Sequence, residues 1–224
     1  MNLVFLGPAG SGKGTQAKKL ERDFGVVQIS TGDLLREAVR NGTELGQLAA
    51  PLIQQGRLVP DEVVIGIIEE RFEDDGLRAG FLLDGFPRTL PQAEALDRML
   101  DRIGRRVDKV LSLEVPHEIL IERITGRRSC PKDGSVYHVV NSPPKREGIC
   151  DRCGTALIQR NDDTREKLER RLEAFRVEIP RVKEHYREKG LLAEIPAVGA
   201  PDAIYAEIRK ALGDVGEAKA ASPV

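Results

Sequence analysis

The stretch Gly7–Thr15 restricts what this chain can fold into more than any other part of its sequence. It follows the apolar run Leu3–Leu6, and after it apolar residues recur with helical spacing at Ala17, Leu20 and Phe24. Strand, glycine-rich turn and helix together form the context of a phosphate-binding P-loop. In such a loop, glycines let successive backbone N–H groups converge, and the following helix adds its positive N-terminal dipole. The sequence therefore predicts a bound nucleotide phosphate here.

The side chains of this loop fit the P-loop pattern with one departure. Gly7 and Gly12 have the expected spacing, and Lys13 can bring a compact ammonium group to the outer phosphates. Gly14 stands where serine or threonine usually follows the lysine, and Thr15 comes one residue later. The alternative is a plain turn without a ligand, but so many glycines are a costly way to make one, because glycine loses the most backbone freedom on folding.

Composition and charge narrow the classes of partner. A chain of 224 residues suits one domain that carries insertions. Its 35 Lys and Arg are offset by 36 Asp and Glu, so an anion site must come from local clustering of cations. The sequence shows neither a signal peptide nor an apolar run long enough for a bilayer, and three cysteines favour a reducing compartment or a metal over disulfides. We expect a cytoplasmic protein without nucleic-acid or membrane partners.

Short apolar segments alternate with helical segments along the chain. This alternation predicts an α/β fold with a five-stranded parallel sheet flanked by helices. Strands are expected near residues 3–6, 26–29, 80–84, 110–113 and 191–195. Helices are expected near 61–72, 91–103, 116–127, 162–189 and 201–212, with small helices over 31–60 broken at Gly42, Pro51 and Gly56. Ligands of such sheets bind at the carboxyl ends of the strands, so Gly7–Thr15, Thr31 and Asp84 should converge.

Several motifs resemble those of adenylate kinase: Gly7–Ala17, Ile29–Arg36, Gly80–Arg88, Gly126–Arg128, and Arg160–Asp163 with Arg171. The resemblance covers nearly the whole chain and implies a P-loop nucleoside monophosphate kinase fold. Its parts would be a core (1–29, 61–126 and 161–213), an AMP-binding insert (30–60), a lid of the long bacterial type (127–160) and a disordered tail (214–224). The implied reaction is ATP + AMP ⇌ 2 ADP with Mg²⁺, catalysed by a monomer whose partners are the nucleotides ATP, AMP and ADP.

The resemblance also implies which residues hold each nucleotide. ATP would contact Gly10, Ser11, Gly12, Lys13, Gly14, Thr15, Arg123, Arg127, Val136, Tyr137 and Gly199. AMP would contact Thr31, Arg36, Arg57, Leu58, Val59, Gly85, Phe86, Pro87, Arg88, Gln92, Arg160 and Arg171, with Gln92 facing the adenine. Thr15 and Asp84 would position Mg²⁺. The catalytic charges would be Lys13, Arg88, Arg123, Arg160 and Arg171, with Asp162 and Asp163 orienting the lid arginines.

The chemistry of phosphoryl transfer agrees with this set of residues. Negative charge spreads over the equatorial oxygens in the transition state, so positioning and electrostatics dominate and no strong base is needed. Water must also be excluded, which requires a lid. Plainer roles are open for three residues: Arg88 as the cap of a surface turn, Tyr137 as lid packing, and Arg171, like its neighbour Arg170, as part of a solvated helix face.

The three cysteines form a second signal. Cys130 and the pair Cys150-x-x-Cys153 lie in two facing turns, and Asp133 stands where a fourth cysteine is usual in metal-bearing lids of the family. A carboxylate is an acceptable zinc ligand, so Cys130, Asp133, Cys150 and Cys153 can close a tetrahedral structural Zn²⁺ site. His138 is a rival fourth ligand. The alternative is a lid held by hydrogen bonds, in which the thiols stay free.

Three rival functions are weighed against adenylate kinase. A kinase for another nucleoside monophosphate is disfavoured by Gln92 and by the long lid. A P-loop switch is disfavoured because the chain lacks the Asn-Lys-x-Asp guanine signature and carries more arginines than one nucleotide needs. A zinc-finger-like nucleic-acid binder is disfavoured because the cysteine turns lack a basic, aromatic-studded helix.

Overall fold

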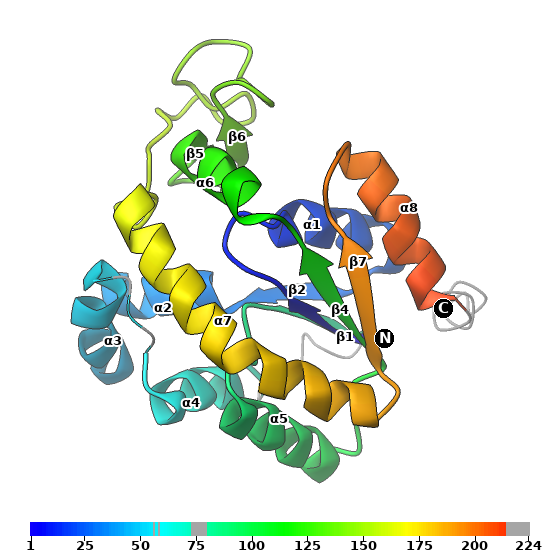
Figure 1. The fold of residues 1–224 in the computed structure, drawn as a ribbon. Coiled ribbons are helices and arrows are strands. Elements are labelled where there is room, and N and C mark those ends of the chain that lie inside the picture. Colours follow the sequence, from blue (N-terminus) through cyan, green and yellow to red (C-terminus); the bar gives the residue numbers. More distant parts are fainter. Residues whose placement is uncertain (56, 58, 73–79, 214–224) are drawn as a thin grey trace.

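The centre of the protein is a parallel sheet of five strands (Figure 1), as the sequence predicts. The structure is a computed structural model that describes residues 1–55, 57, 59–72 and 80–213. In the order β2-β3-β1-β4-β7, the strands are Val27–Ser30, Phe81–Asp84, Asn2–Leu6, Lys109–Glu114 and Leu192–Pro196. Leu58, predicted to contact AMP, and the tail 214–224, predicted to be disordered, lie outside the described residues.

Alternate residues of the strands face two separate cores. Leu3, Phe5 and Leu111 pack with α1 (Lys13–Phe24) and α8 (Pro201–Leu212) on one face of the sheet. Val4, Leu83 and Val110 pack on the other face with α4 (Asp61–Phe72), α5 (Leu90–Arg102) and α7 (Arg165–Glu188). The strands are therefore apolar on both faces, as parallel strands between two helical layers must be.

The register of the central strands brings their polar ends together. In the parallel pairs, Phe5 lies opposite Asp84, and Ser30 also lies opposite Asp84. The P-loop follows β1 directly, and α2 (Thr31–Asn41) follows β2 directly. Gly7–Thr15, Thr31 and Asp84 therefore converge at one edge of the sheet, which confirms the expectation from the sequence.

The helix boundaries follow local signals, with two corrections. Ser30 caps α2 by accepting the N–H of Asp33 at 3.3 Å, and Gly42, in the left-handed conformation, ends that helix. The break predicted at Pro51 is wrong, because α3 (Glu44–Gln55) continues through this exposed proline. Proline removes one N–H, which is a cost that a helix packed against α2 can absorb.

The second correction concerns the entry to the lid. Helix α6 (His117–Thr125) ends earlier than predicted, so Arg127 belongs not to this helix but to β5 (Arg127–Ser129). Strand β5 pairs antiparallel with β6 (Val136–His138), and the chain beyond them projects from the body (Figure 1). The three apolar clusters of the described residues include no residue of 127–160. None of the described helices is long and apolar enough to span a membrane.

Candidate active site

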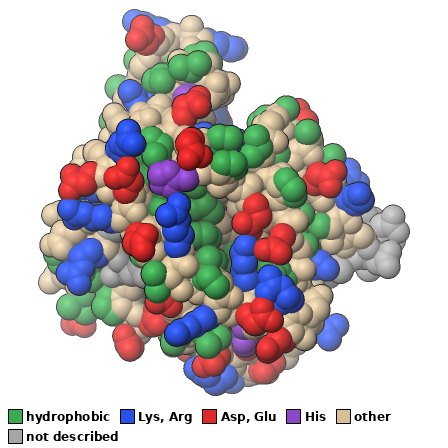
Figure 2. Space-filling model, in the orientation of Figure 1, with side chains coloured by type: hydrophobic (Ala, Val, Ile, Leu, Met, Phe, Trp, Pro, Cys, Tyr) green, Lys and Arg blue, Asp and Glu red, His purple; other side chains and the backbone are tan. Residues whose placement is uncertain are grey.

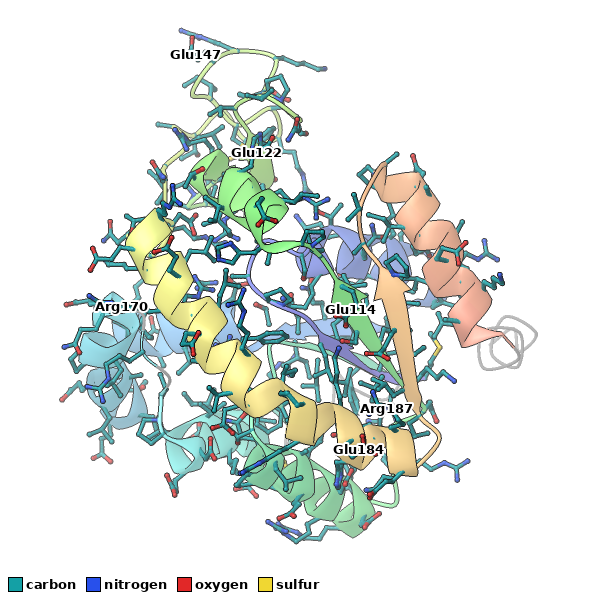
Figure 3. The ribbon with its side chains drawn as sticks, viewed as in Figure 1. Glu114, Glu122, Glu147, Arg170, Glu184 and Arg187 are labelled. Carbon is teal, nitrogen blue, oxygen red and sulfur yellow. The ribbon has the colours of Figure 1, made fainter. Side chains whose placement is uncertain are left out.

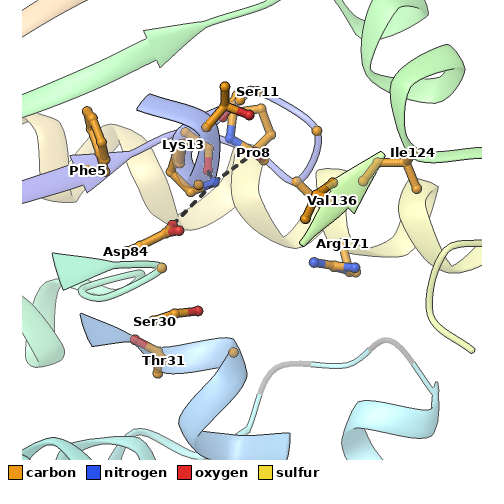
Figure 4. A pocket seen from close by; sticks show the side chains of 18 of the residues that line it. Phe5, Pro8, Ser11, Lys13, Ser30, Thr31, Asp84, Ile124, Val136 and Arg171 are labelled. Atoms are coloured by element: carbon orange, nitrogen blue, oxygen red, sulfur yellow. Dashed lines mark hydrogen bonds and ion pairs between the residues drawn. The ribbon is translucent and has the colours of Figure 1, made fainter. Parts of the chain in front are cut away.

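A cavity of about 730 Å³ lies where the P-loop, α2, α7 and the lid meet (Figure 4). It is lined by every predicted nucleotide-site residue except Phe86 and the undescribed Leu58. Phe86 is fully buried and packs in the core below the cavity. Its side chain therefore supports the neighbouring Pro87 and Arg88, and only its backbone could reach a ligand. The sequence alone could not separate these roles, because the motif places all three residues together.

The P-loop has the backbone that its glycines permit. Gly7, Gly10 and Gly12 have φ of 143°, 85° and 95°, a region that side chains disfavour. At Gly10 a Cβ atom would also lie only 3.2 Å from the carbonyl oxygen of Leu120. Gly14 is different, because it lies within α1 and a Cβ atom there would meet nothing within 4 Å. The unusual Gly14 therefore leaves open space beside the loop.

Lys13 lines the cavity, and its amine points toward Asp84 (Figure 4). Its Nζ donates to the carbonyl oxygens of Gly7 at 2.8 Å and Pro8 at 3.0 Å, and lies 3.9 Å from the Asp84 carboxylate. Burial lowers the pKa of Lys13 to about 8, an effect that the Asp84 charge opposes and the nearby Arg88 reinforces. The ammonium group is thus short of negative charge, which is what an incoming phosphate supplies.

Arg88 and Gln92 are held by a network that the sequence analysis missed. Arg88 donates through Nε to the carbonyl oxygen of Gly85 at 2.8 Å, and its backbone N–H donates to Gln92 Oε1 at 2.8 Å. Asp61 accepts from Gln92 Nε2 at 2.7 Å and from Thr89 Oγ1 at 2.8 Å. Burial lowers the pKa of Arg88 to about 10. Asp61, the first residue of α4, belongs to no sequence motif. Its role in holding Gln92 and Thr89 is visible only in the folded structure.

A second cluster of charges lies where α2 borders the cavity. Asp33 forms an ion pair with Arg36 and lies 4.0 Å from an Arg160 nitrogen. Nearby, the hydroxyl of Thr31 is buried and has no hydrogen-bond partner among the described residues. An unpaired buried hydroxyl is costly, so this position is suited to a polar ligand group.

Two carboxylates in the turn just before α7 orient two further arginines. Asp163, which is fully buried, holds Arg127 through both of its oxygens, and Asp162 accepts from Arg171 at 2.8 Å. Arg171 lines the cavity, whereas Arg170 lies on the outer side of α7 and pairs with Glu166 (Figure 3). Position therefore favours Arg171 over Arg170 as the site residue, and its role stays a prediction. Elsewhere on the face in Figure 2, charges of both signs are interspersed.

The far wall of the cavity is formed by the segment that joins β7 to α8, which contains Gly199. Arg123 donates to the carbonyl oxygens of Gly10 at 3.4 Å and Ala197 at 3.2 Å. Gln16, only 2% exposed, donates from Nε2 to the carbonyl oxygen of Pro201 at 3.0 Å. Arg123 of α6 and Gln16 of α1 therefore tether this segment at its two ends. Gln16 belongs to the quoted motif, but nothing in its spacing indicated this partner.

Tyr137 serves lid packing and also borders the cavity. Its hydroxyl accepts the N–H of Asp151 at 2.8 Å and lies 3.5 Å from Cys150 Sγ, while the residue lines the cavity together with Val136. Val136 projects toward the centre from β6 (Figure 4). Both roles considered for Tyr137 are thus compatible in one position.

The four predicted metal ligands form a cluster. One ligand atom from each of Cys130, Asp133, Cys150 and Cys153 lies within 4.8 Å of all the others. A tetrahedron with zinc–sulfur bonds near 2.3 Å has edges of about 3.8 Å. The Cys130 and Cys153 sulfurs are 3.4 Å apart, and Cys150 Sγ is 3.3 Å from Asp133 Oδ2. Small shifts of the four side chains would therefore bring their ligand atoms to tetrahedral distances. The residues present therefore fit a tetrahedral ion.

His138, the rival fourth ligand, lies outside this cluster. Its Nδ1 accepts the N–H groups of Val140 at 3.1 Å and Asn141 at 3.0 Å. Its Nε2 lies 3.2 Å from the carbonyl oxygen of Glu122 and, since Nδ1 accepts, acts as the donor. His138 thus fastens the base of the lid to the end of α6. Its ring packs against Gly126, where a Cβ atom would clash with the imidazole.

Comparison with known proteins places these features in one family. The family model described as adenylate kinase matches residues 5–191. The adenylate kinase of Caldicellulosiruptor saccharolyticus is 50% identical over 215 residues, which are 95% of this chain and 99% of that protein. The adenylate kinase of Archaeoglobus fulgidus is 48% identical over 212 residues, 95% of this chain and 98% of its own. The similarity therefore includes both the cavity and the lid.

Proposed function

The chain belongs to the adenylate kinase family, and from that premise we propose how the residues of its cavity divide the work of the reaction. The reaction is reversible transfer of a phosphoryl group from ATP to AMP, giving two ADP. One observation carries the assignment of roles. A single cavity brings the P-loop, with Lys13, into line with a second group of cations that includes Arg36 and Arg88.

The donor half holds the phosphates of ATP. Residues Gly10–Thr15 present backbone N–H groups at the N-terminus of α1, and Lys13 adds a charge that burial has left undercompensated. Arg123 and Arg127 approach the same phosphates from α6 and β5. Val136, Tyr137 and Gly199 border the space left for the nucleoside. Gln16 acts as a positioning residue, because it fixes the segment that carries Gly199.

The acceptor half holds AMP. Arg36 and Arg88 bind its phosphate, and Arg160 and Arg171 span the gap between the two phosphate groups. Thr31, Arg57, Leu58, Val59, Gln92 and the backbone of Gly85–Arg88 form the rest of this half. Gln92 already donates to Asp61, so the hydrogen bonds it offers adenine are the remaining N–H and the second lone pair of Oε1. Together the arginines disperse the charge of the transition state.

Two metal ions belong to the proposal. Mg²⁺, which kinases of this family use, would be held near Asp84 and Thr15, whose oxygens are the hard donors that it prefers. When bound, it neutralises charge on the ATP phosphates. Zn²⁺ would be held by Cys130, Asp133, Cys150 and Cys153, and its role would be structural, because the lid contributes to none of the apolar clusters of the described residues.

The proposal divides the chain into a core (1–29, 61–126 and 161–213), an AMP-binding insert (30–60) and a lid (127–160). Insert and lid must swing, since nucleotides need entry and the closed state must exclude water. A monomer located in the cytoplasm stays a prediction. Sedimentation of the purified chain with and without nucleotide tests the monomer.

Acceptor turnover tests the substrate. With MgATP as donor, AMP should have the highest kcat/KM among AMP, GMP, CMP and UMP. A better acceptor than AMP would overturn the substrate assignment and leave the kinase fold standing. Binding of two adenosines joined by five phosphates tests the two-site cavity, because a switch with one nucleotide site should not prefer it to ATP.

A further inference from the structure

We propose that Cys130 and Cys153 form a peroxide-sensitive dithiol in the lid, whose oxidation to a disulfide expels the lid metal. The inference rests on the metal site proposed above only for the expulsion, since the disulfide itself needs only the two thiols. The two cysteines would then be a modification site in the lid, and the reagent would be hydrogen peroxide or an alkyl hydroperoxide.

The sequence and the structure favour different partners for Cys153. By sequence, Cys150-x-x-Cys153 is the spacing of a redox pair. In the structure, however, Cys153 Sγ lies 3.4 Å from Cys130 Sγ, across the two facing turns. Cys150 Sγ is engaged elsewhere, at 3.3 Å from Asp133 Oδ2 and 3.5 Å from the Tyr137 hydroxyl, whereas Cys153 Sγ also contacts Thr155 Oγ1 at 3.3 Å. The geometry therefore selects the pair that is far apart in sequence.

Exposure decides which sulfur reacts first. Cys130 and Cys150 are only 3% and 2% exposed, whereas Cys153 is half-buried. Cys153 is therefore the thiol that a peroxide can reach. No other cysteine exists in the chain to compete. Oxidation of thiols follows their access to the reagent as well as their thiolate character.

The chemistry balances in two steps. The Cys153 thiolate attacks one peroxide oxygen, which breaks the O–O bond, forms a sulfenic acid and releases hydroxide. The Cys130 sulfur then attacks the Cys153 sulfur, the S–S bond forms, and the sulfenic oxygen leaves as water after taking up a proton. In total, the two sulfurs lose two electrons to hydrogen peroxide, which becomes two waters. The two protons come from the thiols in the metal-free lid, and from solvent when both sulfurs are metal-bound thiolates.

The disulfide removes two of the four metal ligands. Asp133 and Cys150 alone offer one oxygen and one sulfur, which is too few for a closed tetrahedral site. The ion should therefore leave, while the new covalent bond replaces it as the link between the turns. Reduction by a dithiol followed by metal addition should restore the original lid.

The decisive experiment is peptide mapping after peroxide treatment of the full-length, metal-loaded protein. Trypsin can cut after Arg152, which separates Cys150 from Cys153. We expect the peptide Ser129–Lys132 to be linked to Cys153–Arg160, with loss of two hydrogen atoms and release of the metal to a chromogenic chelator. Linkage of 147–152 to Cys153–Arg160, or sulfinic acid at Cys153 without any linkage, would overturn the proposal.

Single variants supply matched controls. Cys150→Ser should still form the disulfide, whereas Cys130→Ser and Cys153→Ser should not. Should a variant lose the lid fold, the wild-type peptide map still decides between the two pairings. Metal analysis before treatment keeps the two proposals apart. Protein that holds no metal but forms the 130–153 disulfide would refute the Zn²⁺ assignment and support the dithiol.

Discussion

The cavity and the lid hold their functional residues in place by different means. Cavity residues follow the ends of buried parallel strands, so the packing of the sheet fixes Lys13 and Asp84 to within a few ångströms of each other. The lid has no such support, because its residues belong to none of the apolar clusters of the described chain. There, two turns are joined through cysteine and aspartate side chains. Position is set by hydrophobic burial in one region and by a cluster of cysteine and aspartate side chains in the other.

This difference separates activity from stability. The cavity gathers like charges: burial lowers the pKa of both Lys13 and Arg88, and the positive charge of Arg171 lowers both further. Such repulsion works against folding and is relieved only when phosphates bind. In the lid, the clustered groups would gain by binding the proposed metal whether or not a nucleotide is present. Substitutions should therefore affect activity in the first region and stability in the second.

The neighbours Arg171 and Arg170 give the largest expected contrast. Arg171→Ala should lower kcat/KM about 100- to 1,000-fold, the effect of removing one preorganised donor. Its melting temperature should change little, since the lost repulsion is offset by the lost ion pair with Asp162. Arg170→Ala is the matched control, because Arg170 is on the same helix but does not line the cavity, and it bonds instead to Glu166 and to the carbonyl oxygen of Gln55. Equal losses in both variants would show that α7 acts only as a scaffold.

Metal removal should give the opposite pattern. Chelation is expected to lower the melting temperature by about 5 °C or more, since roughly 2 kcal/mol corresponds to 4–8 °C in a chain of this size. Activity at room temperature should fall by much less than in Arg171→Ala. The variant Asp133→Ala should melt at the temperature of the chelated wild type and respond no further to chelator. A chelator without effect on the wild-type melting curve would remove the metal claim.

Sequence reasoning succeeded where a motif fixes the backbone. Glycines at 7, 10 and 12 predict the P-loop conformation, and the alternation of apolar and helical segments predicts the parallel sheet. It was less successful where a partner comes from a distant element. Asp61 beneath Gln92 is 31 residues away in the chain, and Pro201 beside Gln16 is 185 away. No local pattern encodes such contacts, because they form only when the helices pack.

The fourth metal ligand shows the same limit on a smaller scale. Asp133 and His138 are both suitable by residue type and by spacing. The fold separates them, since the imidazole of His138 is occupied by backbone groups at the base of the lid. The sequence also could not show that Phe86 turns into the core while Arg88 enters the cavity.

The smallest expected effect is the uptake of a fraction of a proton by Lys13 when nucleotide binds. It directly tests whether the like charges of the cavity are relieved by bound phosphates. Free protein has its Lys13 pKa lowered to about 8 by burial, below the ordinary value of 10.5. Bound phosphates should raise it again, so nucleotide binding takes up a proton between these two pH values. We expect about 0.9 proton at pH 9 and about 0.1 at pH 7.

Titration calorimetry with the compound of two adenosines joined by five phosphates, repeated in buffers of different ionisation enthalpy, measures this proton uptake. Lys13→Met is the control, because it keeps the chain length and removes the titrating group. In that variant the difference between pH 7 and pH 9 should vanish. For the free protein the sign follows from the same shift: the unfolded chain binds more protons between pH 8 and 10.5, so Lys13 makes the free energy of unfolding rise with pH in that window. Equal uptake at both pH values in the wild type would mean that Lys13 is already compensated before the phosphates arrive.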